Sequence, residues 1–224
     1  RCVERTMIPL RAGGRGLRSV LCLGAHCDDI EIGCGATLRR LRRESPSTRM
    51  HWVVFSSNPT REAEARASAE RVLGPDACTH RVDILRFRNG HFPYFGEELK
   101  QAFEVLKGEA SPDLILTHFR DDLHQDHRTV SELTWNTFRD HAILEYEIPK
   151  WDGGLGSPNV FVPSSRHDAQ LKARDLVECF PSEATKHWFS EDLFLGLMRI
   201  RGVECAAPDG YAEAFYARKL VVGF

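Results

Sequence analysis

The chain has 224 residues, of which 42% are hydrophobic and 28% are charged. This length and composition are typical of one soluble globular domain with a substantial core. The net charge of −2 excludes the basic surface that binding to nucleic acid requires. No apolar run reaches the roughly 18–20 residues that span a bilayer, and the N-terminal segment lacks the apolar stretch of a secretory signal.

The cysteines are scattered along the chain and are never spaced as CxxC. This pattern predicts free thiols in a reducing compartment, and hence a cytoplasmic protein, rather than a disulfide scaffold or a cysteine-rich zinc site. The seven cysteines stand at positions 2, 22, 27, 34, 78, 179 and 205.

Apolar runs and helical patterns alternate through the first 140 residues. Predicted strands lie at 20–25, 50–55, 81–87 and 114–117, and predicted helices at 36–43, 61–73, 95–108 and 128–138. Thr60 is the expected N-cap of the second helix. This alternation predicts an α/β fold with a mainly parallel sheet and helices on both faces.

The last third of the chain has a different pattern. Strands are expected at 143–148, 159–162 and 213–222, and helices at 167–179 and 191–199, with a long loop at 150–158. We expect this part to form a C-terminal lobe added to the sheet. The predicted organisation is a single domain over 1–224, with an α/β core at 19–140 and a substrate-shaping part at 141–224.

Two polar clusters follow predicted strands. His26, Asp28 and Asp29 come directly after the first strand, and the segment 118–127 follows the fourth. Because adjacent aspartates repel each other, a nearby cation explains their pairing better than a solvated loop with a helix-capping aspartate does. Both clusters fall at the C-terminal ends of parallel strands, where α/β sheets bind ligands, so we expect one shared site.

The residue types in these clusters indicate a catalytic metal. Two histidines and one carboxylate, as in His26, Asp29 and His127, leave coordination positions open, which is typical of catalytic zinc. The same set fits ferrous iron, and spacing does not choose between the two metals. Asp28 would then lie beside the metal, placed to take a proton from bound water.

Other polar residues are candidates for supporting roles. His124 can share a face of a helical turn with His127, and Asp126 can hold one of these histidines or favour the charged form of His124. Arg61 is expected in the first turn of a helix, where a cation opposes the macrodipole, so it is expected to serve a loop, a carboxylate or a ligand rather than solvent alone. The Cys27 side chain should point away from its two neighbours.

At these residues the chain resembles the PIG-L/LmbE-like zinc-dependent de-N-acetylases, which remove acetyl groups from N-acetylglucosamine-type sugars. The resemblance rests on AHCDDIE at 25–31, on Arg61 and Glu64 with a following Leu-Gly, and on HQDH at 124–127. It implies a Rossmann-like fold. It also implies zinc on His26, Asp29 and His127, Asp28 as general base, His124 as oxyanion stabiliser or acid, and Arg61 and Asp126 near the site.

The chain departs from the family motif at two positions. Cys27 stands where the family has proline, which removes a backbone restriction and leaves a thiol near the metal. Ile30 occupies the place of the motif glutamate, and Glu31 follows it. Whether Glu31 takes over the role of that glutamate is left open by the sequence.

Segments 144–153 and 158–163 are similar to members associated with bacterial surface-glycan or glycoside biosynthesis. Tyr146, Trp151 and Phe161 are candidates for stacking on a sugar, with burial in the core as the alternative for two of the three. Arg61 is a further candidate for substrate binding. Homo-oligomers are common in such families, but no stretch of this chain indicates an interface.

Three hypotheses for function follow. The first is a zinc-dependent hydrolase that removes an N-acetyl group from an acetamido sugar, such as a GlcNAc-type glycoside or glycan precursor. The second is a metal-dependent amidohydrolase that acts on a non-sugar amide or a thiol conjugate. The third is a nucleotide-binding protein in which Gly33 and Gly35 approach a phosphate; the segment GCGATL lacks the GxGxxG spacing for this.

Overall fold

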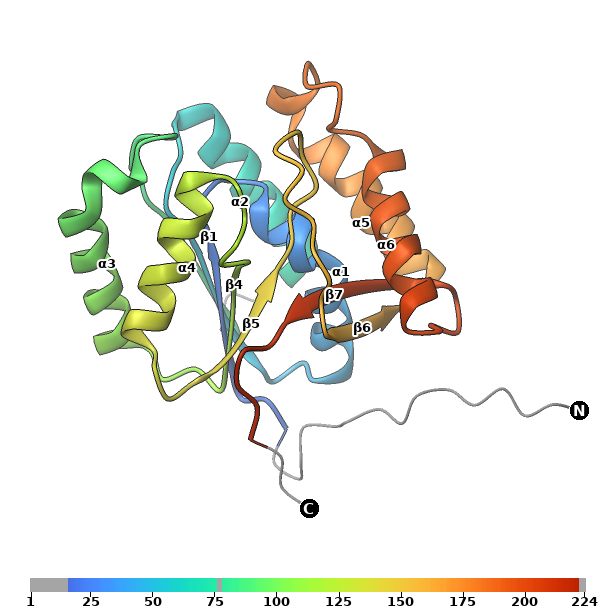
Figure 1. The fold of residues 1–224 in the computed structure, drawn as a ribbon, viewed down its shortest axis with the longest axis horizontal. Helices are drawn as coiled ribbons and strands as arrows, with labels where there is room; N and C mark the ends of the chain where they lie inside the picture. Colours follow the sequence, from blue (N-terminus) through green and yellow to red (C-terminus); the bar gives the residue numbers. More distant parts are fainter. Residues whose placement is uncertain (1–15, 76–77, 222–224) are drawn as a thin grey trace, which may run out of the picture.

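The computed structural model describes residues 16–75 and 78–221. Its strands form one seven-stranded sheet in the order β3-β2-β1-β4-β5-β7-β6 (Figure 1). The strands are β1 (Ser19–Gly24), β2 (Arg49–Val54), β3 (His80–Ile84), β4 (Leu114–His118), β5 (Ala142–Tyr146), β6 (Val160–Ser164) and β7 (Tyr211–Tyr216). Cys2 and most of the segment considered as a secretory signal lie outside the described residues.

Strands β1 to β5 pair in parallel, whereas β7 is antiparallel to both β5 and β6. Helices α3 and α4 cover one face of the sheet, and α1, α2 and α5 cover the other (Figure 1). The helices are α1 (Asp29–Glu44), α2 (Pro59–Leu73), α3 (Gly96–Glu109), α4 (Gln125–Thr137), α5 (Arg166–Cys179) and α6 (Glu191–Glu204), with short 3-10 turns at Phe92–Phe95 and Pro181–Glu183. The predicted α/β fold with a mainly parallel sheet is confirmed.

Strand β1 lies at the centre of the sheet and supplies the apolar core on both faces. Val20 and Cys22 pack under α1, α2 and α5, while Leu21 and Leu23 pack under α3 and α4. Successive side chains of a strand point to opposite faces, so a strand covered on both sides needs an unbroken apolar run. This is why the sequence places the first polar residues directly after β1.

Helix α1 begins at Asp29, seven residues before the predicted start at Ala36. The helix is kinked at Cys34, whose φ is −147°. Beyond the kink, the Glu213 carboxylate of β7 accepts hydrogen bonds from the backbone N–H groups of Ala36 at 2.9 Å and Thr37 at 2.6 Å. A buried carboxylate from a distant strand therefore caps the second segment of α1, which the local sequence does not reveal.

The starts of two other helices also differ from the prediction. Asn58, not Thr60, caps α2: its side chain accepts a hydrogen bond from the Arg61 N–H at 3.0 Å, with Pro59 in the first turn. Arg61 lies in that first turn, as predicted. Helix α4 begins at Gln125 rather than at 128, and His124 is its N-cap.

The last third of the chain adds strands to the sheet, as expected for a C-terminal lobe that is added to it. It contributes β5, β6 and β7, and α6 packs against β7 and α5. The Arg201 guanidinium of α6 binds both oxygens of Glu147 at 2.7 Å, which fixes the segment that follows β5. We propose that residues 1–224 form one domain. In the part of the chain that the structure describes, no helix is long and apolar enough to span a membrane.

Candidate active site

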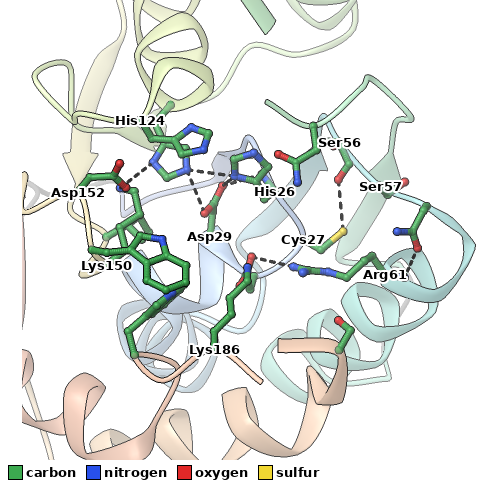
Figure 2. A pocket seen from close by; sticks show the side chains of 18 of the residues that line it. His26, Cys27, Asp29, Ser56, Ser57, Arg61, His124, Lys150, Asp152 and Lys186 are labelled. Carbon is green, nitrogen blue, oxygen red and sulfur yellow. Dashed lines mark hydrogen bonds and ion pairs between the residues drawn. The ribbon is translucent and has the colours of Figure 1, made fainter. Parts of the chain in front are cut away.

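The two polar clusters meet at the C-terminal ends of β1 and β4. His26, Asp28 and Asp29 come from the end of β1 and the start of α1, whereas His124 and His127 come from the β4–α4 connection and the first turn of α4. Figure 2 shows His26, Asp29 and His124 facing one another across a pocket, with Arg61 on its other side. The two clusters that the sequence predicted to share one site therefore lie together at this edge of the sheet.

Three side chains form a compact set of metal-binding atoms. His26 Nδ1 lies 3.1 Å from His127 Nε2. The Asp29 carboxylate approaches these two atoms through different oxygens, with Oδ2 3.3 Å from His26 Nδ1 and Oδ1 3.4 Å from His127 Nε2. In a tetrahedral zinc site with ligand bonds of about 2.0–2.1 Å, the ligand atoms are about 3.3–3.4 Å apart. Two imidazole nitrogens and a carboxylate at this spacing fit a zinc ion.

Each of the two histidines has a carboxylate on its other ring nitrogen. Asp126 Oδ2 lies 3.1 Å from His26 Nε2, and Asp122 Oδ2 lies 2.9 Å from His127 Nδ1. A carboxylate accepts a hydrogen bond from the N–H of one ring nitrogen and leaves a lone pair on the other, where a metal binds. The sequence predicted that Asp126 holds His124 or His127, whereas the structure pairs it with His26. The role of Asp122 was not predicted.

His118 lies close to the same atoms but is a poorer metal ligand. Two overlapping groups bring ligand atoms within 4.8 Å of one another in the described chain: His26 with His124 and His127, and Asp29 with His118 and His127. The His118 Nε2 accepts a hydrogen bond from the backbone N–H of Ala25 at 2.9 Å, which occupies its lone pair. Burial lowers the pKa of His118 to about 3, so the ring is neutral.

Arg61 is surrounded by carboxylates. Its guanidinium lies 3.0 Å from Asp28 Oδ1 and 3.7 Å from Glu64 Oε2, and it also contacts Glu183. The expectation that Arg61 serves something other than solvent is met by these ion pairs, although Arg61 also lines the pocket. Its contact with Asp28 orients that carboxylate beside the metal-binding atoms.

His124 is neutral, contrary to the expectation that Asp126 favours its charged form. Burial and the nearby histidines, His127 first and then His26, lower the pKa of His124 to about 4. The Asp126 carboxylate instead binds His26 and the backbone N–H groups of Gly90 and Phe92. His124 Nδ1 accepts the backbone N–H of Asp126 at 3.2 Å, so the hydrogen of the neutral ring is on Nε2.

A model of the PIG-L family, described as GlcNAc-PI de-N-acetylase, matches residues 21–138. The chain belongs to this family. It is 30% identical over 143 residues to the Uncharacterized deacetylase YaiS of Escherichia coli (strain K12), a match that covers 59% of this chain and 75% of the relative. The protein is thus a deacetylase, that is, an amide hydrolase.

Solved structures similar to this PIG-L deacetylase share its fold at low sequence identity. The N,N'-diacetylchitobiose deacetylase from Pyrococcus horikoshii is 19% identical with a TM-score of 0.69, over 90% of this chain and 84% of that one. GalB, the 4-carboxy-2-hydroxymuconate hydratase from Pseudomonas putida KT2440, is 16% identical with a TM-score of 0.70, over 92% and 98%. The fold alone therefore carries more than one chemistry.

The deacetylase pocket has a volume of about 650 Å³ and two walls. One wall consists of the loops that follow β1, β2 and β4, and the other comes from the last third of the chain. That second wall contains Ile148, Lys150, Trp151, Asp152, Ser182, Lys186 and Trp188. The rings of Trp151 and Trp188 lie edge to face with centroids 6.3 Å apart, and Trp151 is 63% exposed. Trp151 thus lies where a substrate can reach it.

The other two aromatic candidates lie elsewhere. Tyr146 is fully buried because β5 is covered on both faces. Its hydroxyl donates to the Leu23 carbonyl at 2.6 Å. The prediction that Tyr146 stacks on a sugar is therefore wrong. Phe161 packs against the apolar cluster of Cys205, Ala207 and Ala212 rather than in the pocket.

The positions at which the chain departs from the family motif are buried. The Cys27 thiol donates to the Ser56 carbonyl at 3.3 Å, and burial raises its pKa to about 12. Cys27 belongs to neither group of candidate metal ligands in the described chain. Ile30 lies in the apolar core, and Glu31 is only 3% exposed.

Gly33 serves packing. A Cβ on Gly33 would lie 2.2–2.8 Å from ring atoms of Tyr146, whereas one on Gly35 would make only an ordinary contact, 3.7 Å from Lys172. Gly33 therefore allows α1 to approach β5 closely. This arrangement gives no support to the nucleotide-binding hypothesis.

Several residues near the metal-binding atoms were not predicted. Asp122 holds His127, and the Lys150 ammonium binds both oxygens of Asp122 at 2.8 and 3.0 Å. Lys186 and Trp188 line the pocket from the α5–α6 connection. Asp122 lies within the HFRDDLHQDH segment and could have been noted there, whereas nothing in the local sequence links the two lysines and Trp188 to the site.

Proposed function

We propose that this deacetylase hydrolyses the N-acetyl group of an acetamido sugar of the GlcNAc type, with zinc held by His26, Asp29 and His127. The observation that carries the proposal is the convergence of two imidazole nitrogens, 3.1 Å apart, with the Asp29 carboxylate, whose two oxygens lie 3.3 and 3.4 Å from them; this donor set and spacing suit zinc. Ferrous iron fits the same donors. The carboxylates of Asp126 and Asp122 hold the two histidines in the tautomers that a metal requires.

The remaining residues supply proton transfer and charge stabilisation. Zinc bound at the triad supplies Lewis acidity and lowers the pKa of a water ligand to roughly 7. Asp28 takes the proton of the attacking water, and Arg61 holds Asp28 in place through Oδ1. The neutral His124 donates its Nε2–H to the oxygen of the tetrahedral intermediate. Asp28 then returns the proton to the departing amine, which leaves acetate and the free amino sugar.

The second wall of the pocket supports a sugar substrate. The exposed Trp151 and the adjacent Trp188 offer aromatic faces on which the C–H groups of a sugar ring can stack. The same pocket is also lined by Ser57, Asn58 and Asn89, which offer hydroxyl and amide groups for hydrogen bonds to the hydroxyls of a sugar. The volume of about 650 Å³ exceeds that of one sugar ring, which supports a glycoside or a short glycan as the substrate.

The division of roles is tested with three variants. Asp29→Ala and His127→Ala should lose bound zinc, because each removes one ligand of the triad. Asp28→Asn should keep zinc and lose most acetate release. Metal content of the purified variants and acetate released from a panel of acetamido sugars measure both properties. Full zinc in Asp29→Ala, or zinc lost from Asp28→Asn, would refute the assignment.

The substrate class is tested with the wild-type enzyme. Acetate release from N-acetylglucosamine, a chitobiose-type disaccharide and simple acetamido glycosides is compared with release from N-acetylated thiols and amino acids. Faster turnover of the sugars supports the proposal. Turnover confined to the non-sugar amides would replace it with the second hypothesis, a metal-dependent amidohydrolase of other amides or thiol conjugates.

A further inference from the structure

A second cavity, of about 430 Å³, lies between α4 and the segment that follows β7. It is lined by Arg120, Ser131, Glu132, Trp135, Asn136, Arg139, Arg218 and Lys219. None of these residues lines the deacetylase pocket. The cavity is therefore a separate feature of the surface, and the proposed reaction gives it no role.

The cavity gathers positive charge that the protein leaves largely unpaired. Four of its lining residues are cations, and Glu132 is its one acidic lining residue. In the described chain, the one salt bridge among these four cations is between Arg120 and Asp121, at 3.7 Å with both side chains exposed. Because the whole chain carries a net charge of −2, such a cationic concavity does not follow from composition. Like charges held together in this way favour an anion between them.

Neighbouring groups hold two of the cations in place. The Arg218 guanidinium carbon lies 4.4 Å from the ring centroid of Trp135, and the Lys219 ammonium lies 5.3 Å from it. Lys219 also donates to the Arg139 carbonyl at 2.7 Å. The Trp135 ring is itself fixed by its N–H, which donates to Glu145 at 2.5 Å. These contacts orient the cations but leave most of their N–H donors available.

A buried hydroxyl in the cavity wall also lacks a partner. Ser131 is 0% exposed, and its Oγ makes no hydrogen bond with the described residues. Leaving a buried polar group unpaired costs about 1–3 kcal/mol. Rotation of the Ser131 side chain about χ1 would present this hydroxyl to an acceptor oxygen in the cavity that it lines. The charge and the hydroxyl are independent observations, and both favour a ligand rich in acceptor oxygens.

We propose that this cavity binds the phosphoryl group of a phosphorylated small molecule. Guanidinium groups match phosphate oxygens with paired hydrogen bonds, and three arginines converge here. The cationic lining residues outnumber the acidic one by three, and the buried Glu145, which accepts from Trp135 and interacts with Arg218 and Arg120, offsets part of this charge. A dianion offsets the remainder better than a single carboxylate does. The cavity has room beyond one phosphoryl group, which fits a sugar phosphate or a similar molecule.

The test measures binding of inorganic pyrophosphate and of glucose 1-phosphate to the zinc-loaded enzyme by isothermal titration calorimetry. Arg139→Ala and Arg218→Ala should each weaken binding by about 10–100-fold, since each removes charge-assisted hydrogen bonds. Arg174→Ala is the matched control, because it removes the same charge from an exposed arginine of α5, outside the cavity. Its affinity should equal that of the wild type. Equal affinity in all four proteins would overturn the proposal.

Ser131→Ala separates ligand binding from a structural role. The variant removes an unpaired buried hydroxyl, so its unfolding temperature should stay equal to that of the wild type or rise, while pyrophosphate binding weakens. Unchanged pyrophosphate binding would show that the Ser131 hydroxyl does not contact the ligand. Vesicles that contain phosphatidic acid form the second arm, because a lipid headgroup offers the same phosphoryl chemistry. Binding to vesicles without binding to the two small phosphates would overturn the proposal.

Discussion

The Asp122→Asn substitution tests whether this carboxylate prepares His127 for a metal. Asp122 accepts from the His127 Nδ1–H at 2.9 Å and binds Lys150 at 2.8 Å. Asparagine keeps an oxygen for His127 but loses the charge that Lys150 requires. Because its side chain is only 8% exposed, Lys150 cannot turn to bulk water without disturbing the site.

The expected loss of zinc affinity follows from these contacts. Removing the partner of a metal-ligating histidine costs about 10–100-fold in affinity, which is about 1.4–2.7 kcal/mol. We expect the upper part of this range, because a buried ammonium also loses its carboxylate. Lys150→Met should not lower zinc affinity, which should equal or exceed that of the wild type. Without the ammonium, the Asp122 carboxylate makes His127 a more basic ligand.

Zinc affinity is measured by competition with a chromogenic chelator. Asp121→Asn is the control, because Asp121 is the adjacent residue, is 73% exposed and forms an ion pair with Arg120 rather than with the candidate metal ligands. It should bind zinc as the wild type does. A zinc affinity of Asp122→Asn within twofold of the wild-type value would show that the carboxylate does not prepare His127 for a metal. A loss of the same size in Asp121→Asn would point instead to the net charge of the loop.

Three further predictions concern residues beside the metal-binding atoms. Gly33→Ala should lower the free energy of unfolding by about 1–3 kcal/mol or more, measured by urea denaturation, because its Cβ would overlap the Tyr146 ring; an unchanged midpoint would refute this packing. Burial raises the pKa of Glu31 to about 8. The neutral acid in the folded state therefore contributes stability below the unfolded value near 4.5, and that stability is lost as pH rises toward 8. The difference in unfolding temperature, Glu31→Gln minus wild type, should then increase between pH 5 and pH 8. A difference that stays constant over this range would contradict the raised pKa of Glu31. Cys27→Ser should change zinc affinity by less than about tenfold, because the thiol faces the Ser56 carbonyl; a larger loss would make Cys27 a partner of the metal.

The sequence carried most of the information on the site because its key residues lie directly after strands. His26 and Asp29 follow β1 within five residues, and His127 follows β4 at the start of a helix. Parallel strands bring such positions to one edge of the sheet without any knowledge of side-chain packing. That these two polar clusters lie together was therefore predictable from the order of the strands and the polar residues that follow them.

The rest depended on contacts between distant segments. The start of α1 was missed because Gly33 and the kink at Cys34 interrupt the helical pattern, and the cap at Glu213 comes from another strand. Tyr146 was misassigned because an amphipathic ring suits both a core and a sugar site, and only the neighbours of β5 decide. Lys186 lies in the pocket because the α5–α6 connection folds back over it.

The cap on α1 sets an order of events during synthesis. Glu213, which accepts from the Ala36 N–H, stands 177 residues further along the chain. The same carboxylate binds the buried Lys172 ammonium of α5 at 2.6 Å. A ribosome makes α1 well before β7, so the amides beyond its kink receive their partner only when β7 has emerged. Asp29 begins this helix, so the helix that carries a proposed metal ligand is completed only by a strand that is translated long after it.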